Sequence, residues 1–321
     1  MKSWLIIWLF FILLQTALIS HPTAFGALQV EVFLFDVHDE ARRRVIPIKV
    51  YVPREKRSRI PAVLFSHGLG GSREASSYLG QYWASAGYVA VFMQHPGSDE
   101  NIWKDAPLNK RLDALKQAVN TQALLQRIRD VSFIIDRLEQ WNQEKGHPLS
   151  GRLNIQKIGM SGHSFGAVTT QAVMGQKFVG NLHFKENRLK AFLLFSPSAG
   201  QGMRPEESFG HIQSPVMCMT GTEDHSPIRG VVTAESRRKV FSALPAGDKF
   251  QVVFQGGHHY TFSERDMADK ETRDPRFHPA IQHLSTAFWD AYLKDDDKQR
   301  AYLQSNGPRA VLIENDIWEW K

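Results

Sequence analysis

The sequence predicts an α/β fold with a mostly parallel central sheet, helices on both faces and an antiparallel hairpin at the N-terminal edge. Short apolar runs typical of buried strands alternate with helical segments from residue 61 onward. Residues 28–53 instead alternate apolar and polar positions on either side of the charged turn HDEARRR, which indicates a hairpin. Only about twenty residues separate the strands ending near residue 196 and starting near residue 216, so no large cap domain is expected.

The elements are expected in a regular order along the chain. After the hairpin come a buried strand at residues 62–68, a helix at 78–87 and a strand at 88–97. Apolar residues recur at helical spacing from residue 106 to 144, which indicates one long helix or two in series. Four more buried strands are expected at 155–160, 190–196, 215–221 and 250–256, followed by an amphipathic helix at 278–293. The tail at 317–321 is expected to dock on the body.

The first 26 residues predict a secretory signal peptide, which is set apart from the fold. Lys2 precedes an apolar run that reaches Ile19, and Ala24 and Gly26 occupy the −3 and −1 positions of a cleavage site. The rival interpretation is an uncleaved anchor, since the run is close to the roughly 20 residues that a membrane span requires. Cleavage predicts a secreted or periplasmic protein without a stable membrane span, and leaves residues 27–321 as a single domain.

The composition argues against several classes of protein. Cys218 is the sole cysteine, so an intramolecular disulfide is impossible, and its apolar neighbours predict a buried thiol. The net charge is +6, but the basic residues are scattered; the clusters at residues 42–44 and 54–59 are expected to be solvated, and no nucleic-acid partner is expected. The 13 histidines show no metal-ligand spacing and no dinucleotide motif is present, so neither a metal nor a cofactor is expected. The oligomeric state is left open.

The sequence GHSFG at residues 162–166 fits the pattern G-x-S-x-G and lies between an expected strand and an expected helix. A tight turn from strand to helix holds the central serine out from the sheet, and the glycines make room for the turn. We therefore identify Ser164 as a candidate nucleophile.

A serine hydroxyl needs a base and an orienting acid, which follow the serine in the order acid, then histidine, in this kind of fold. The turn after residues 215–221 offers Glu223 and Asp224, of which Asp224 is preferred because it lies further into the loop. The turn after residues 250–256 offers His258 and His259. Adjacent side chains point in different directions, and the residues alone leave this choice open.

An oxyanion requires two preorganised N–H donors. The backbone N–H of Phe165, directly after the candidate nucleophile, is one candidate. The other is expected in the glycine-rich loop FSHGLGGS, where the glycines let the backbone approach a ligand closely, and the N–H of Leu69 is the preferred donor.

Together these residues resemble an α/β-hydrolase. The segment SHGLGGSREASSYLGQYWASAGYVAVFMQHPGS, followed by GHSFGA, resembles bacterial secreted serine hydrolases labelled as predicted dienelactone hydrolases. It is also similar to plasma-type platelet-activating-factor acetylhydrolases and, more distantly, to cutinase-like polyester hydrolases. Such relatives end the last strand in G-G-x-H, which selects His259 as the base. The elbow holds a serine in place of the cysteine of true dienelactone hydrolases, and Cys218 alone cannot form the disulfide usual in polyester hydrolases.

The resemblance implies a secreted serine hydrolase whose catalytic domain, residues 27–321, cleaves carboxylic esters through Ser164, Asp224 and His259 and an acyl-enzyme. The expected partner is a small-molecule or lipid-like ester. Two alternatives are a non-catalytic binding module on the same scaffold and an acyltransferase that uses the same acyl-enzyme. Without a cap domain, the site is expected to be open.

Overall fold

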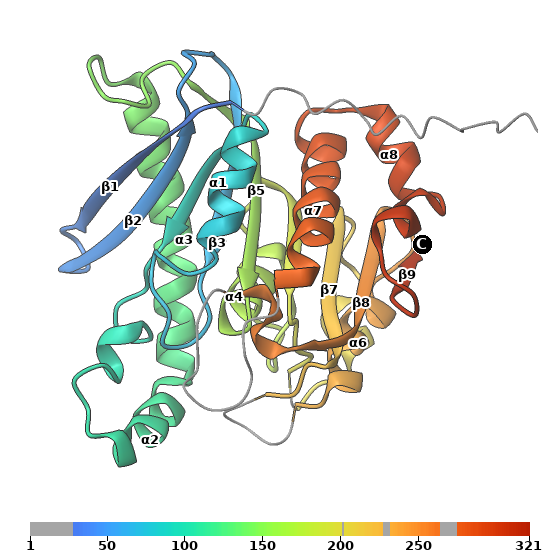
Figure 1. Cartoon of the computed structure of the whole chain (residues 1–321). Helices are drawn as coiled ribbons and strands as arrows, with labels where there is room; N and C mark the ends of the chain where they lie inside the picture. Colours follow the sequence, from blue (N-terminus) through green and yellow to red (C-terminus); the bar gives the residue numbers. More distant parts are fainter. Residues whose placement is uncertain (1–27, 201, 227–231, 264–274) are drawn as a thin grey trace, which may run out of the picture.

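The computed structural model describes residues 28–200, 202–226, 232–263 and 275–321, and within these ranges nine strands form one sheet (Figure 1). The signal peptide predicted over residues 1–26 lies outside the described residues. The strands are β1 (Val30–Asp39), β2 (Arg44–Pro53), β3 (Ile60–Ser66), β4 (Val89–Met93), β5 (Leu153–His163), β6 (Leu189–Phe195), β7 (Val216–Glu223), β8 (Lys249–His258) and β9 (Ile317–Trp320).

The strand order is β1-β2-β4-β3-β5-β6-β7-β8-β9. All neighbours from β4 to β8 pair in parallel, whereas β1 with β2, β2 with β4, and β8 with β9 pair antiparallel. The predicted mostly parallel sheet with an antiparallel N-terminal hairpin is confirmed, and the arrangement is that of an α/β-hydrolase.

Helices cover both faces of the sheet. They are α1 (Ser77–Ser85), α2 (Leu108–Ala118), α3 (Thr121–Gln143), α4 (Phe165–Met174), α5 (Pro205–Phe209), α6 (Ala234–Ala243), α7 (His278–Leu293) and α8 (Asp297–Leu303). The short 3₁₀ helices are η1 (Glu100–Ile102), η2 (His259–Phe262), η3 (Pro275–Phe277) and η4 (Gly307–Val311). One apolar core lies between the sheet and α3, α4 and α6, and a second lies between the sheet and α1, α7 and α8 (Figure 1).

The helical pattern at residues 106–144 forms two helices in series, α2 and α3. The break falls at Asn120, whose extended backbone leaves the helix while its side chain accepts a hydrogen bond from Ala123 N at 2.9 Å. Such a side-chain cap satisfies one of the free N–H groups at a helix start. Between β6 and β7 the described residues hold only the five-residue α5, in keeping with the absence of a large cap domain.

The C-terminal tail docks as strand β9 along β8, a strand that the sequence analysis did not predict. Trp318 is 2% exposed, its ring centroid lies 5.7 Å from that of Phe250, and its Nε1 donates to Ser305 O at 3.0 Å. Antiparallel pairing with β9 covers the edge that β8 would otherwise present to solvent.

The parallel strands determine where chemistry can occur. In such a sheet, ligands bind beyond the carboxyl ends of the strands, and these ends lie along one edge. The glycine-rich loop follows β3, Ser164 follows β5, Asp224 follows β7 and His259 follows β8. The fold therefore brings four segments that are far apart in the sequence to the same edge.

Candidate active site

Ser164 lies in the tight turn between β5 and α4, with φ of 56° and ψ of −115°. A positive φ is strained for a residue with a Cβ and persists where the surroundings enforce it. A Cβ on Gly166 would lie 1.8 Å from Ser66 O, and one on Gly162 would lie 2.3 Å from Gly166 O. Both glycines are thus required by the close approach of backbones at the turn, which leaves Ser164 partly exposed at its tip.

Three side chains at the ends of β5, β7 and β8 form a hydrogen-bonded chain. His259 Nε2 lies 2.9 Å from Ser164 Oγ, and His259 Nδ1 lies 2.8 Å from Asp224 Oδ1. Because a carboxylate can only accept, the bond to Asp224 requires the proton on Nδ1, and Nε2 is then free to accept from the hydroxyl. The structure therefore brings together the serine, the acid and the histidine that were proposed from the sequence.

Asp224 is fully buried, and other side chains besides His259 contact its carboxylate. Thr220 Oγ1 donates to its Oδ2 at 2.8 Å, and Arg237 Nε lies 2.7 Å from its Oδ1. Burial raises the pKa of the carboxyl, but the hydrogen bond from His259 and the charges of His259 and Arg237 outweigh burial and hold the pKa below its usual range. Asp224 is therefore ionised at neutral pH.

The neighbouring candidates are directed elsewhere. Glu223 is exposed and lies opposite His258 in the register of β7 and β8. His258 caps the start of η2, where its Nδ1 accepts a hydrogen bond from Tyr260 N at 3.2 Å. Of each adjacent pair, it is Asp224 and His259 that the structure directs towards the serine.

His163 fixes the backbone of the histidine loop. Its Nε2 donates to His259 O at 2.9 Å, and the two ring centroids lie 4.7 Å apart. Burial and the charge of the neighbouring imidazole lower the pKa of His163 to about 3, so its ring is neutral near pH 7. His163 was not singled out from the sequence, although it is the variable residue of the G-x-S-x-G motif before the serine.

The residues proposed as oxyanion donors are Leu69, in the loop after β3, and Phe165, which directly follows the serine. Phe165 is the first residue of α4, so its N–H has no acceptor within the helix. A Cβ on Gly68 would lie 3.5 Å from Ser164 Cβ, which places the glycine-rich loop in contact with the serine. The loop that carries Leu69 and the helix start that carries Phe165 therefore both adjoin Ser164.

Arg127, on α3, holds the glycine-rich loop in place through hydrogen bonds. Its fully buried guanidinium donates to His67 O at 2.7 Å and to Ser98 Oγ at 2.8 Å. Ser98 O in turn accepts from Gly70 N at 2.9 Å. The guanidinium carbon of Arg127 also lies 4.4 Å from the ring centroid of Phe165, so one cation contacts both segments that carry the proposed donors.

The buried carboxylate of Asp130, on the same helix as Arg127, connects α3 to the N-terminal hairpin. Asp130 accepts from Arg42 and Arg44 at 2.8 Å each and from His95 Nδ1 at 3.0 Å. Burial raises the pKa of Asp130, but His95 and Arg44 outweigh it and lower the pKa to about 2. The prediction that residues 42–44 form a solvated face is wrong for Arg42 and Arg44, because a buried carboxylate needs cationic partners.

An apolar wall stands beside the proposed donors. Leu69, Phe165 and Leu115 form a small buried cluster, against which Trp103 packs. Trp103 Nε1 also donates to Gly70 O at 2.8 Å. Helix α2, which was not expected at the site, supplies Leu115 to this wall.

Among the described residues, no group of three or more His, Cys, Asp or Glu side chains is arranged to hold a metal ion. Within the same part of the chain, no helix is both long enough and apolar enough to cross a membrane.

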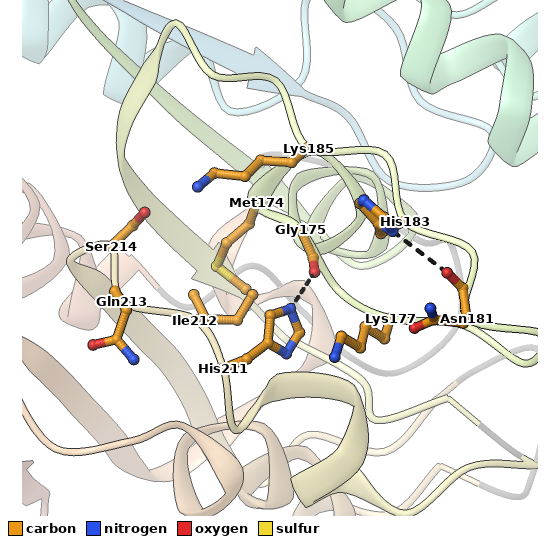
Figure 2. A pocket seen from close by; sticks show the side chains of 10 residues that line it. All are labelled: Met174, Gly175, Lys177, Asn181, His183, Lys185, His211, Ile212, Gln213 and Ser214. Atoms are coloured by element: carbon orange, nitrogen blue, oxygen red, sulfur yellow. Dashed lines mark hydrogen bonds between the residues drawn. The ribbon is translucent and has the colours of Figure 1, made fainter.

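A groove of about 350 Å³ lies at Met174 and Gly175, the end of α4 opposite to Ser164. Figure 2 shows the side chains that line it. Its lining includes Met174, Ile212, Lys177 and Lys185, as well as His211, whose Nε2 donates to Gly175 O at 2.9 Å. None of the residues of the hydrogen-bonded chain lines it. Since a ten-residue helix is about 15 Å long, this groove is separate from the candidate active site.

One protein family matches part of the chain. Residues 43–101 match the model of the family described as platelet-activating factor acetylhydrolase, isoform II. No curated protein matches the chain. The matched segment runs from the hairpin through the glycine-rich loop to η1 and ends before the serine elbow. Together with the sheet topology, the match supports an α/β-hydrolase similar to platelet-activating-factor acetylhydrolases.

Proposed function

We propose that the protein is an exported serine esterase that cleaves carboxylic esters through an acyl-enzyme. The observation that carries the proposal is the hydrogen-bonded chain from Asp224 through His259 to Ser164, with distances of 2.8 and 2.9 Å. Its members lie at the edge of the sheet where ligands bind in open α/β folds. The partial similarity to an acetylhydrolase family supports an ester as substrate.

In the proposed reaction Ser164 Oγ attacks the ester carbonyl while His259 Nε2 takes its proton. Asp224 keeps the other proton on Nδ1 and stabilises the imidazolium that forms. The N–H groups of Leu69 and Phe165 bind the oxyanion, and each such donor typically contributes 10²–10³-fold in rate. His259 then protonates the leaving alcohol, and water that it activates releases the acid from the acyl-enzyme.

The surroundings of the serine favour an ester with a short acyl group or a lipid-like alcohol. The residues proposed as donors, Leu69 and Phe165, belong with Leu115 to an apolar cluster, and an apolar substituent of the ester would suit such surroundings. The family that matches residues 43–101 is described as a platelet-activating factor acetylhydrolase, which supports a short acyl group. We place this activity in a single domain, residues 27–321, that is released by cleavage of a signal peptide and needs no metal or cofactor.

The test is hydrolysis of p-nitrophenyl butyrate by the mature protein and by Ser164→Ala, His259→Ala and His258→Ala, with folding checked by circular dichroism. We expect Ser164→Ala and His259→Ala to lose at least about a thousandfold in kcat/KM. His258→Ala is the matched control. It should keep most of the rate, because the His258 ring is directed at the backbone of η2 rather than at Ser164.

Loss of activity in His258→Ala but not in His259→Ala would overturn the assignment of the base. An inactive wild-type protein that also resists a fluorophosphonate probe would overturn the esterase and favour a binding module. Product analysis with added alcohols distinguishes hydrolysis from acyl transfer, since both begin from the same acyl-enzyme.

A further inference from the structure

A buried arginine lies beside the acid and the histidine of the proposed triad. Arg237, on α6, is 2% exposed. Its Nη1 donates to Ser196 O at 2.8 Å, to Pro197 O at 3.2 Å and to Ser198 Oγ at 3.0 Å. These bonds to the loop after β6 hold the guanidinium in one orientation, so its other nitrogens have defined positions.

The remaining nitrogens of Arg237 point at the triad. Nε lies 2.7 Å from Asp224 Oδ1 and donates to Asp224 O at 2.8 Å. Nη2 lies 3.0 Å from His259 Nδ1. Oδ1 is also the oxygen that accepts from His259 Nδ1, so a guanidinium, a carboxylate and an imidazole meet around one atom.

This geometry makes the two neighbours of His259 Nδ1 act in opposite directions. The carboxylate of Asp224 favours a proton on Nδ1, because it can only accept. The guanidinium of Arg237 has only donors, so it cannot accept the Nδ1 proton, which Asp224 Oδ1 holds, and its positive charge disfavours the imidazolium. Both groups are buried, so solvent screens these interactions weakly.

We propose that Arg237 is a positioning residue of the triad, which holds the Asp224 carboxylate in place and keeps His259 unprotonated at lower pH. The inference rests on the proposed function, since it assigns to Arg237 the lower pH limit of the same esterase reaction. Because the general base must be neutral to accept the serine proton, a cation at Nδ1 extends activity towards acid pH.

The other groups that face His259 do not replace this effect. Among the described residues, the titratable ones are His163 from β5, Asp224 after β7, and Tyr260, which adjoins the ring on η2. The Ser164 hydroxyl at Nε2 carries no charge. His163 is neutral above pH 4, since burial lowers its pKa to about 3, and it therefore adds no positive charge in the range of the assay. Arg237 is the cation from α6 that contacts the ring directly.

The experiment compares the pH profile of kcat/KM for p-nitrophenyl butyrate, from pH 5 to 8.5, in the wild type and in Arg237→Gln and Arg237→Lys. Removing the charge should move the acid limb of Arg237→Gln upward by roughly one to three pH units. Arg237→Lys keeps the charge, so its acid limb should stay closer to that of the wild type even if its rate falls. Arg238→Met is the matched control, because Arg238 is on the same helix but pairs with Glu319 at 3.3 Å.

A second measurement does not depend on turnover. Nuclear magnetic resonance titration of the His259 ring, in a Ser164→Ala background with and without Arg237→Gln, should show the same upward shift. An acid limb and a ring titration that coincide with the wild type in folded Arg237→Gln would overturn the proposal, as would a downward shift. If Arg237→Gln does not fold, Arg237→Met serves as the neutral variant. An inactive wild type would refute the esterase, whereas the ring titration would still decide the role of Arg237.

Discussion

His95 provides a direct test of how the buried polar network depends on pH. It follows β4, is fully buried, and its Nδ1 donates to Asp130 Oδ2 at 3.0 Å while its Nε2 lies 3.0 Å from Ser66 Oγ. Although a carboxylate is adjacent, burial and the charge of Arg127 lower the pKa of His95 to about 4. The ring is therefore neutral in the folded protein near pH 7. We predict that the free energy of unfolding of His95→Asn falls less than that of the wild type when the pH is lowered.

Stability should fall on the acid side because the pKa of His95 is lower in the folded protein than in the unfolded chain. In the unfolded chain the ring protonates near pH 6.5, before it can protonate in the folded protein near pH 4. The stability contribution of the neutral ring is therefore complete above pH 6.5 and falls as the pH drops to 4. At about 1.4 kcal/mol per pH unit, protonation over this interval lowers the free energy of unfolding by about 3 kcal/mol. His163 adds a loss of the same sign, but it is present in the wild type and in the variant alike.

The assay is urea unfolding of the wild type and His95→Asn between pH 4.5 and 8, followed by tryptophan fluorescence. The asparagine can still donate to Asp130 but cannot titrate, so the variant should lose about 2–3 kcal/mol less than the wild type between pH 7 and 4.5. His38→Asn is the control, since His38 is exposed and should leave the dependence unchanged. Equal losses in the wild type and His95→Asn would refute a neutral, buried His95.

Four further outcomes follow from the packing. Gly166→Ala should yield insoluble or unfolded protein, because its Cβ would lie 1.8 Å from Ser66 O; soluble expression with a wild-type melting curve would contradict this. Trp318→Ala should lower the free energy of unfolding by about 3–5 kcal/mol in urea titrations, since its ring is 2% exposed. The Cys218 thiol is buried and its pKa is raised to about 12, so a thiol reagent should react with it only after denaturation. Arg127→Lys should lower kcat more than it changes KM, because it loosens the loop that carries a proposed oxyanion donor; a change in KM alone would point to substrate binding instead.

The fold class was predictable from the sequence because its signals are local. Buried parallel strands are continuous apolar runs, the hairpin alternates, and the serine elbow has glycines at fixed positions. Gly162 and Gly166 show why the motif is informative, since each lies where a backbone approaches too closely for a side chain. The same local patterns located Asp224 and the histidine pair, because each follows an expected strand.

The sequence by itself determined the strands of the hairpin and of the parallel sheet, the elbow and the residues that could serve a serine hydrolase, since each depends on neighbouring positions, whereas strand β9 appeared only in the tertiary structure. The residues alone left the choice between His258 and His259 open, and the family resemblance selected His259; the tertiary structure shows the ring of His259 at Ser164, because this depends on the backbone at the end of β8. Tertiary structure also decided the roles of the arginines. Arg237 and Arg127 are separated from their partners by as many as 41 and 61 residues, and a helical pattern does not reveal that a cation is buried. Their burial is stabilised by oxygen atoms that lie mainly in loops after β3, β4, β6 and β7, and these loops become neighbours only once the sheet has formed.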